Sequence, residues 1–128
     1  MLYIIDTYAW MEYFIGSKKG EVLIKLLSDE TNELITVDCC LAEIKGWSLR
    51  NSLNFEQLFN IIRANSKIIL MSENNWIQAG KERFEQRKTQ KDFGLIDSAI
   101  LVKQKELRTQ VVSGDKHFKN LKNIVFLD

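Results

Sequence analysis

The chain has 128 residues, of which 45% are hydrophobic and 27% are charged, a composition typical of a single soluble globular domain. Its 18 basic and 17 acidic residues leave a formal net charge of +1, which excludes a strongly basic molecule, so any nucleic-acid site has to be a local patch. No apolar run reaches about 18 residues, and no basic segment precedes the apolar start, so we expect neither a membrane span nor a secretory signal.

The two cysteines, Cys39 and Cys40, are neighbours in the sequence. A disulfide between adjacent residues is strained, so we predict two buried thiols in a reducing, cytoplasmic compartment. His117 is the only histidine, and no spacing of cysteine and histidine fits a zinc site.

The first six residues are apolar up to Ile5 and end in an acid, Asp6. A continuous apolar run of this length is typical of a strand covered on both faces of a parallel sheet. A helix is predicted to follow from about Tyr8 to Ile15, closed by Gly16. Asp6 is therefore expected where a central strand ends and a helix begins.

A second helix is predicted after Ser17, which we interpret as its N-cap. Its apolar stripe consists of Val22, Leu23, Leu26 and Leu27. Residues 34–37 are short, apolar and β-branched and predict the second strand. Asp38 then stands where it could cap a helix over about 39–49.

Asn54, with Gln57 three residues later, indicates the start of another helix. Its apolar residues follow the helical spacing: Phe55, Leu58, Phe59 and Ile62. Residues 67–70 predict a third strand. Ser72 is expected to cap a long helix that ends near Arg87, with an apolar stripe formed by Trp76, Ile77, Gly80 and Phe84.

Phe93 and Gly94 interrupt the helical pattern, and residues 95–107 then predict a helix with a wide apolar face. A strand is expected over 110–113 and a last strand over 124–127. Strands that alternate with helices indicate one three-layer α/β/α sandwich with a parallel sheet, which we assign to residues 1–128 as a single domain.

Four carboxylates occur beside predicted strand ends: Asp6, Glu43, Asp97 and Asp115. The carboxyl ends of parallel strands share one edge of the sheet, where ligands bind in open α/β folds. Crowded carboxylates repel each other unless a cation joins them, and ligand sets made only of oxygen suit Mg²⁺ or Mn²⁺. Metal-assisted hydrolysis is therefore the chemistry that these residues favour.

Each acid also has a simpler interpretation when taken alone. Asp6 and Asp97 could cap helices, and Asp115 could be a turn residue. Glu43 could be an exposed acid near a helix N-terminus. His117 is assigned to a turn, without a catalytic role. Two further acids, Asp38 and Asp92, are left outside the site.

Four segments in this order resemble the PIN-domain family, and within it the VapC-type ribonuclease toxins of prokaryotic toxin–antitoxin pairs. The segments are the opening strand with Asp6-Thr7, then Leu41-Ala42-Glu43-Ile44, then Leu95-Ile96-Asp97-Ser98-Ala99-Ile100, and finally Val111-Val112-Ser113-Gly114-Asp115-Lys116-His117-Phe118. The resemblance covers the whole chain and implies a five-stranded parallel sheet of order 3-2-1-4-5. It also implies an endoribonuclease that depends on Mg²⁺ or Mn²⁺.

Carried over residue by residue, the resemblance assigns Asp6, Glu43, Asp97 and Asp115 as the catalytic, metal-binding acids. It assigns the hydroxyls of Thr7 and Ser113 to their support, with Ser113 standing where threonine is more usual. The implied partners are an RNA substrate and an antitoxin protein. A homodimer is also expected.

Some apolar side chains of the first helix exceed what one helix face buries, and we expect part of them to line a groove or a dimer contact: Trp10, Met11, Tyr13 and Phe14. A housekeeping RNA-processing nuclease and a PIN-like binding module without catalysis remain alternatives to the toxin. A haloacid-dehalogenase-like phosphatase is disfavoured, because Tyr8 stands where a second aspartate would be needed.

Overall fold

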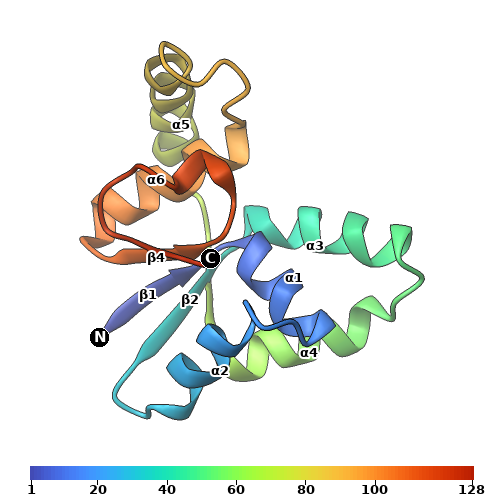
Figure 1. Ribbon diagram of the computed structural model, residues 1–128. Helices are drawn as coiled ribbons and strands as arrows, with labels where there is room; N and C mark the ends of the chain where they lie inside the picture. Colours follow the sequence, from blue (N-terminus) through green and yellow to red (C-terminus); the bar gives the residue numbers. More distant parts are fainter.

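A parallel sheet of five strands forms the centre of the computed structural model, which describes residues 1–128 (Figure 1). The strands are β1 (Leu2–Ile5), β2 (Glu33–Val37), β3 (Lys67–Ile69), β4 (Gln110–Ser113) and β5 (Ile124–Phe126). Their order is β3-β2-β1-β4-β5, and every neighbouring pair is parallel. The predicted fold class and strand order are confirmed.

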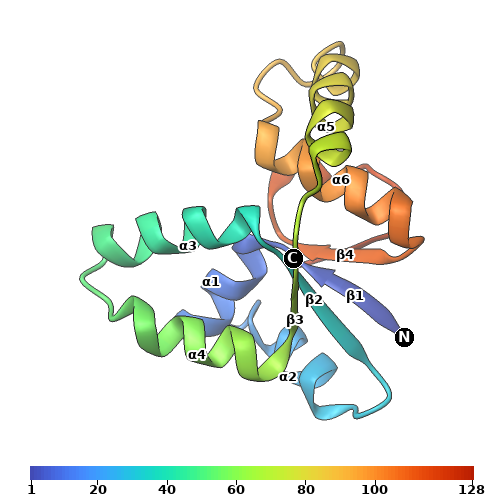
Figure 2. The same cartoon turned by 180° about the vertical axis from the view of Figure 1, so that it is seen from behind.

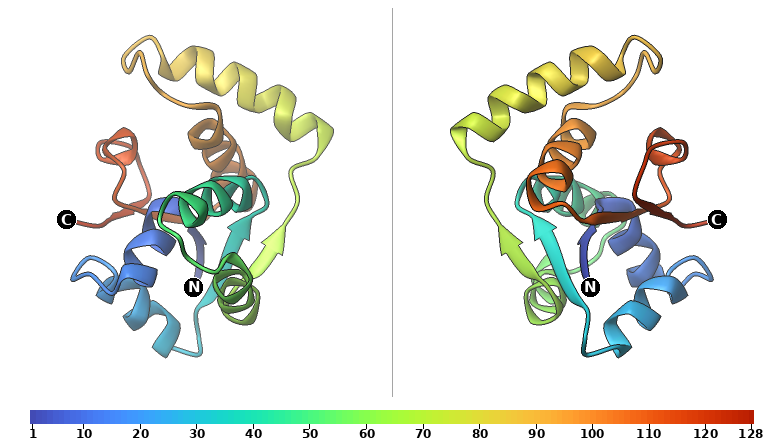
Figure 3. Two further views of the ribbon diagram at one scale, coloured as in Figure 1. Left: turned by 90° about the vertical axis from the view of Figure 1, so that its right-hand side faces the viewer. Right: turned by 90° about the vertical axis from the view of Figure 1, so that its left-hand side faces the viewer.

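The helices lie on both faces of this sheet. They are α1 (Thr7–Ile15), α2 (Glu21–Ser28), α3 (Cys39–Arg50), α4 (Phe55–Asn65), α5 (Glu73–Gln86), α6 (Leu95–Leu107) and the 3₁₀ turn η1 (Lys116–Phe118). Figures 1 and 2 show α1, α2 and α4 on one face and α6 on the other. Figure 3 shows α5 on the outer side of α6, so α5 packs on a helix and not on the sheet. None of the helices has the combination of length and hydrophobicity that a membrane crossing requires.

The central strand, β1, has β2 on one side and β4 on the other. Ile5 pairs with Val112, and the N–H of Asp6 donates to the carbonyl of Val112 at 3.0 Å. The chain order reverses direction between β1 and β4, which makes the carboxyl ends of these two strands the topological switch point of the sheet. Asp6 and the residues that follow Ser113 therefore lie at the edge where such folds bind ligands.

The core between β1, β2 and α1 contains a fully buried tryptophan, Trp10. Its Nε1–H donates to Oγ1 of Thr36 at 3.1 Å, and Thr36 shares a 2.7 Å hydrogen bond with Ser66. The Ser66 hydroxyl also donates to the carbonyl of Ile62 at 2.7 Å. Because a buried polar group without a partner is costly, this chain of bonds allows the indole to enter the core.

The aromatic residues around Trp10 pack against each other. Phe14 stacks on Trp10 at 5.7 Å between ring centroids and lies 6.4 Å from Trp47. Tyr13 and Phe14 are half-buried against the core. The expected groove or dimer contact at this helix stays a prediction. Cys39 and Cys40 are both buried and unbridged, as the sequence predicts.

Two predicted helix caps differ from the structure. Helix α2 begins after Gly20, and Ser17 caps the turn before it: its hydroxyl accepts from the N–H of Gly20 at 3.2 Å and donates to the carbonyl of Glu12. Asp38 precedes α3 without capping it, because its carboxylate accepts a hydrogen bond at 3.1 Å from the N–H of Met71. The caps predicted at Asn54 and Ser72 are confirmed by bonds to Gln57 and Asn75.

The apolar stripe predicted for α5 does not face the core. Trp76 is 39% exposed, and Ile77 and Phe84 are each 67% exposed. The buried residues of this helix are Asn75 and Ala79. The period of the stripe is helical, but the small residues of α5 face α6 and the large ones point away.

We predict that Thr36→Val lowers the free energy of unfolding by about 1–3 kcal/mol, because valine keeps the shape of threonine but leaves the buried Trp10 N–H without an acceptor. Urea unfolding followed by circular dichroism measures this change. Thr89→Val is the matched control, since the hydroxyl of Thr89 is exposed and bonds only to the carbonyl of Gln86. Equal losses in both variants would show that the Trp10 bond contributes nothing.

Candidate acidic site

Asp6 is the most buried acid of the site, with 4% of its surface exposed. The hydroxyl of Ser113, at the end of β4, donates to its Oδ2 at 2.7 Å. The Asp6 side chain makes no capping bond to α1, so the simpler interpretation of this residue as a helix cap is wrong. Burial raises the pKa of Asp6 from 3.8 to about 7, against the effect of the Ser113 bond, and the charges of Asp97 and Glu43 add to the increase.

Glu43 extends from α3 toward the same edge of the sheet. Oγ1 of Thr7 donates to its Oε1 at 2.7 Å, so a residue next to Asp6 in sequence orients it. Much of the Glu43 side chain is exposed, but its carboxylate is shielded. This shielding, and the charges of Asp97 and Asp115, raise its pKa.

Asp97 lies in the first turn of α6 and Asp115 follows β4. Oδ2 of Asp97 receives only a long bond, 3.4 Å, from the N–H of Gly94. Burial raises the pKa of Asp97, and the charge of Asp115 raises it further. The N–H of Asp115 donates to the Ser113 hydroxyl at 3.0 Å, so Ser113 links Asp115 to Asp6.

Gly114 lets the end of β4 approach the first turn of α1. A Cβ atom at this position would lie 2.4 Å from Cε1 of the Tyr8 ring, far closer than non-bonded carbon atoms approach each other. Only glycine therefore fits between Ser113 and Asp115 while the Tyr8 ring keeps its place. This contact fixes the spacing between the segment that carries Asp6 and the segment that carries Asp115.

His117 also contacts this site, which the sequence interpretation missed. Its Nδ1 lies 2.9 Å from Oδ2 of Asp97 and 3.1 Å from Oδ1 of Asp115. Its Nε2 lies 3.1 Å from Oδ1 of Asp92, an acid that we left outside the site. Burial alone would lower the pKa of His117, but these three carboxylates raise it overall. The contact with His117 in turn lowers the pKa of Asp92.

One signal in the sequence could have identified His117. Asp115 starts a tight turn in which its Oδ1 accepts from the N–H of His117 at 2.9 Å, two residues later. An aspartate in such a turn directs the next side chains back over its own carboxylate. The only histidine of the chain at that position was therefore a candidate for the site.

The distances divide these side chains into two groups. Ligand atoms of Asp97, Asp115 and His117 all lie within 4.8 Å of one another, close enough to share one cation. Asp6 and Glu43 are outside this group, although the charge of Asp97 raises the pKa of both. The assignment of the four acids as metal ligands stays a prediction.

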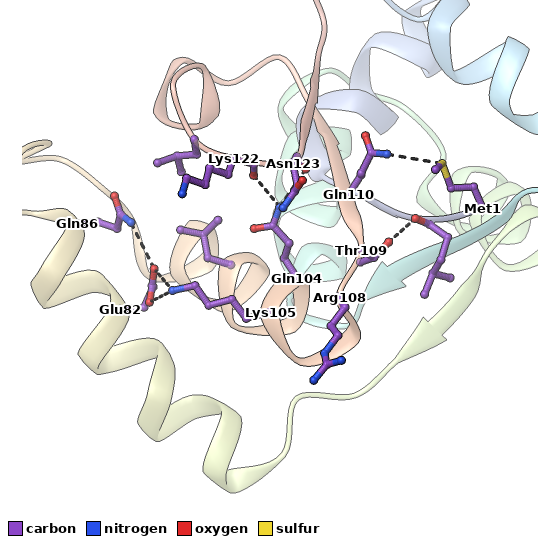
Figure 4. A pocket seen from close by; sticks show the side chains of 13 residues that line it. Met1, Glu82, Gln86, Gln104, Lys105, Arg108, Thr109, Gln110, Lys122 and Asn123 are labelled. Carbon is purple, nitrogen blue, oxygen red and sulfur yellow. Dashed lines mark hydrogen bonds and ion pairs between the residues drawn. The ribbon is translucent and has the colours of Figure 1, made fainter.

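A cavity of about 720 Å³ lies elsewhere, at the amino ends of β1 and β4 (Figure 4). Some of its polar groups bond to each other: Lys105 pairs with Glu82 at 2.9 Å, and Gln104 Nε2 donates to the carbonyls of Lys122 and Asn123 at 3.0 Å. The group of side chains close enough to share a cation lies at the acidic edge and not in this cavity, so the acidic edge is the better candidate.

Comparison with solved structures shows the same fold in toxin–antitoxin proteins. VapC20 of Mycobacterium tuberculosis, described as a sarcin–ricin loop cleaving toxin, matches with a TM-score of 0.79 and 12% identity over 98% of this chain and 99% of that chain. A chain of the VapBC2 complex of Rickettsia felis, bound to a DNA fragment from its promoter, matches with a TM-score of 0.72 and 20% identity. The match covers 98% of this chain and 97% of that chain. A chain of VapBC-1 from nontypeable Haemophilus influenzae matches with a TM-score of 0.68 and 19% identity. The match covers 100% of this chain and 98% of that chain.

At these identities the comparison establishes that the chain has the PIN-like fold of VapC structures, as the sequence predicts. No protein-family model matches the sequence, and no curated protein is significantly similar to it.

The raised pKa of Asp6 predicts that the metal-free protein loses stability as the pH increases. An acid whose pKa is higher in the folded state stabilises the fold only while it is protonated. Its contribution is complete below pH 3.8 and is lost as the pH rises through about 7. The difference between these pKa values corresponds to a loss on the order of 4 kcal/mol.

We expect Asp6→Asn, measured in EDTA, to show a flatter dependence of unfolding free energy on pH between 4 and 8, and to be at least as stable as wild type at pH 8. Glu30→Gln, an exposed acid outside the site, is the control and should follow the wild-type curve. Parallel curves for wild type and Asp6→Asn would mean that Asp6 is already ionised at low pH.

Proposed function

We propose that this protein is a metal-dependent endoribonuclease and the toxin of a toxin–antitoxin pair. The observation that carries the proposal is the buried carboxylate of Asp6 at the switch point of the sheet, in electrostatic contact with Glu43 and Asp97. An acid whose pKa is raised by burial, and further by its acidic neighbours, is costly to fold and is typical of a functional site. The fold shared with VapC structures supports the same conclusion.

The donor set fits a divalent cation, because it consists of carboxylates whose mutual repulsion a cation would relieve. We assign Asp6, Glu43, Asp97 and Asp115 as the acids that hold Mg²⁺ or Mn²⁺. A bound cation would supply a water of lowered pKa and neutralise charge on the phosphate that is cleaved.

Two hydroxyl side chains of the protein orient the carboxylates of Asp6 and Glu43. The Ser113 hydroxyl fixes one oxygen of Asp6 by a 2.7 Å bond, which leaves the other oxygen of the carboxylate for a ligand. Thr7 fixes Oε1 of Glu43 in the same way and leaves Oε2 free to accept a proton or a cation. Both hydroxyls thereby orient carboxylates before any ligand binds, which reduces the cost of ordering them later.

The substrate that we propose is single-stranded or loop RNA, whose bases and backbone are accessible to a shallow site. The proposed partner is an antitoxin that inserts a basic side chain among the acids, since arginine pairs with a carboxylate through two hydrogen bonds. A homodimer remains part of the proposal. A housekeeping RNA-processing nuclease and a catalytically silent binding module are the alternatives that the experiments below distinguish.

We predict that the purified protein cleaves loop-containing RNA with Mg²⁺ or Mn²⁺ and not with EDTA. Because water is the nucleophile in this mechanism, the products should carry 5′-phosphate and 3′-hydroxyl ends, which end-labelling and mass spectrometry identify. Asp97→Asn should reduce the rate by more than about 100-fold, since even residues behind metal ligands contribute factors of 10–100.

Asp38→Asn is the matched control, because the Asp38 side chain bonds to the backbone of Met71 and to none of the four acids, so this variant should retain activity. A 2′,3′-cyclic phosphate product would show that the RNA's own hydroxyl attacks, which would rule out metal-assisted hydrolysis. Folded protein that binds RNA without cleaving it would favour the binding module.

We further predict that induction of the protein in bacteria arrests growth, and that Asp6→Asn at equal expression does not. Co-expression of a short reading frame adjacent to the gene should restore growth. The measurement is the growth rate with immunoblots for protein level. If wild type cleaves RNA in vitro and yet has no effect on growth, the toxin assignment is wrong and the housekeeping nuclease is favoured.

A further inference from the structure

The imidazole of His117 lies among three carboxylates. Only 13% of its side chain is exposed, and neither buried ring nitrogen has a hydrogen-bond partner of acceptable geometry. Oxygen atoms of Asp97, Asp115 and Asp92 nevertheless lie 2.9–3.1 Å from these nitrogens. The ring therefore places Nε2 beside Asp92 and Nδ1 beside both Asp97 and Asp115.

The surrounding chain holds the ring in this position. The carbonyl of His117 accepts a bond from Nε2 of Gln90 at 2.9 Å, and its N–H donates to Asp115 at 2.9 Å. The ring packs against the buried Phe93 at 5.5 Å between centroids. Residues from the segment before α6 and from the turn after β4 thus fix His117 together, without any need for a cation.

The spacing of the atoms fits the coordination shell of one cation. Metal–ligand bonds of about 2.1 Å at right angles separate neighbouring ligand atoms by about 3.0 Å. Nδ1 of His117 lies 2.9 Å from Asp97 and 3.1 Å from Asp115, and the three ligand atoms fall within 4.8 Å of one another. An imidazolium that served only to neutralise these acids would be expected to point its N–H groups at them.

The other ring nitrogen faces Asp92, whose Oδ1 lies 3.1 Å from Nε2. Histidines that bind metals usually present their second nitrogen to a carboxylate, which fixes the tautomer and makes the first nitrogen a better ligand. Asp92 and the pair Asp97 and Asp115 lie on opposite sides of the ring in this arrangement.

We propose that His117 contributes Nδ1 as a nitrogen ligand to the divalent cation, together with Asp97 and Asp115, and that Asp92 is the residue that positions the ring. This inference rests on the proposed function for the presence of the cation. It makes the site selective, because imidazole suits first-row transition cations, whereas Mg²⁺ prefers oxygen ligands. The protein should therefore bind Mn²⁺ more tightly than Mg²⁺.

The decisive measurement uses the only histidine of the chain. Protein without a histidine tag is loaded with Mn²⁺, and its pulsed electron-paramagnetic-resonance spectrum is recorded with natural and with ¹⁵N-labelled histidine. We expect a nitrogen coupling that changes with the label, which identifies His117 without any substitution. Mn²⁺ bound at one equivalent without this coupling would overturn the inference and leave the proposed nuclease intact. Failure of wild type to bind Mn²⁺ at all would overturn both.

Substitutions test the selectivity by calorimetry. His117→Gln should weaken Mn²⁺ binding by at least about 10-fold and Mg²⁺ binding by less than about 3-fold, and Asp92→Asn should weaken Mn²⁺ binding in the same direction. His117→Asn serves if the glutamine variant does not fold, and Asp38→Asn is the control that should bind as wild type. Equal losses for both cations would show that His117 has only a structural role.

Discussion

The structure depends on a carboxylate that is kept out of water at the end of its central strand. Asp6 is 4% exposed and receives one side-chain hydrogen bond, from Ser113. One such bond does not replace the hydration of an ionised acid, which explains why the pKa of Asp6 is about 7. The strand order makes this burial possible, because β1 has a neighbour on each side and helices on both faces.

The same constraint organises the residues around Asp6. Thr7 and Ser113 each bond to one acid, and Ser113 also accepts from the backbone of Asp115. These small hydroxyl side chains connect β1, α3 and β4 at a single edge. At this edge His117 lies against Asp97 and Asp115, and the side chain of Glu43 reaches solvent. The site therefore combines rigid support with a face that a ligand can approach.

Most of the fold could be predicted from the sequence, because its strands are short apolar runs and most of its helices have a clear period. The strand order was predicted from the resemblance to the PIN-domain family and not from periodicity. Parallel strands of similar composition do not show in their own sequence which strands lie beside them. The orientation of α5 was wrong, because period shows that Trp76, Ile77 and Phe84 share a face but not whether the core lies against it. Asp38 failed as a cap because the N–H of Met71 binds its carboxylate, and Ser17 caps the turn before α2 and not the helix itself.

The site was predicted less completely. The four acids were recognisable because each stands beside a strand end, whereas Asp92 and His117 meet through tertiary contacts between a loop and a turn. No spacing in the sequence connects position 92 to position 117. Contacts of this kind depend on how α6 and η1 are placed on the sheet, which local patterns do not determine.

Gly114 has a consequence for how this sequence can vary. The residue is required by space and not by its backbone angles, because the ring of Tyr8 occupies the volume that a Cβ atom would need. A side chain at 114 would therefore need the ring at position 8 to be lost or displaced, and the carbonyl oxygen of Leu127, 3.1 Å from the same Cβ position, to move slightly as well. The distance between the segment of Asp6 and the segment of Asp115 thus depends on two residues that carry no charge, Tyr8 and Gly114.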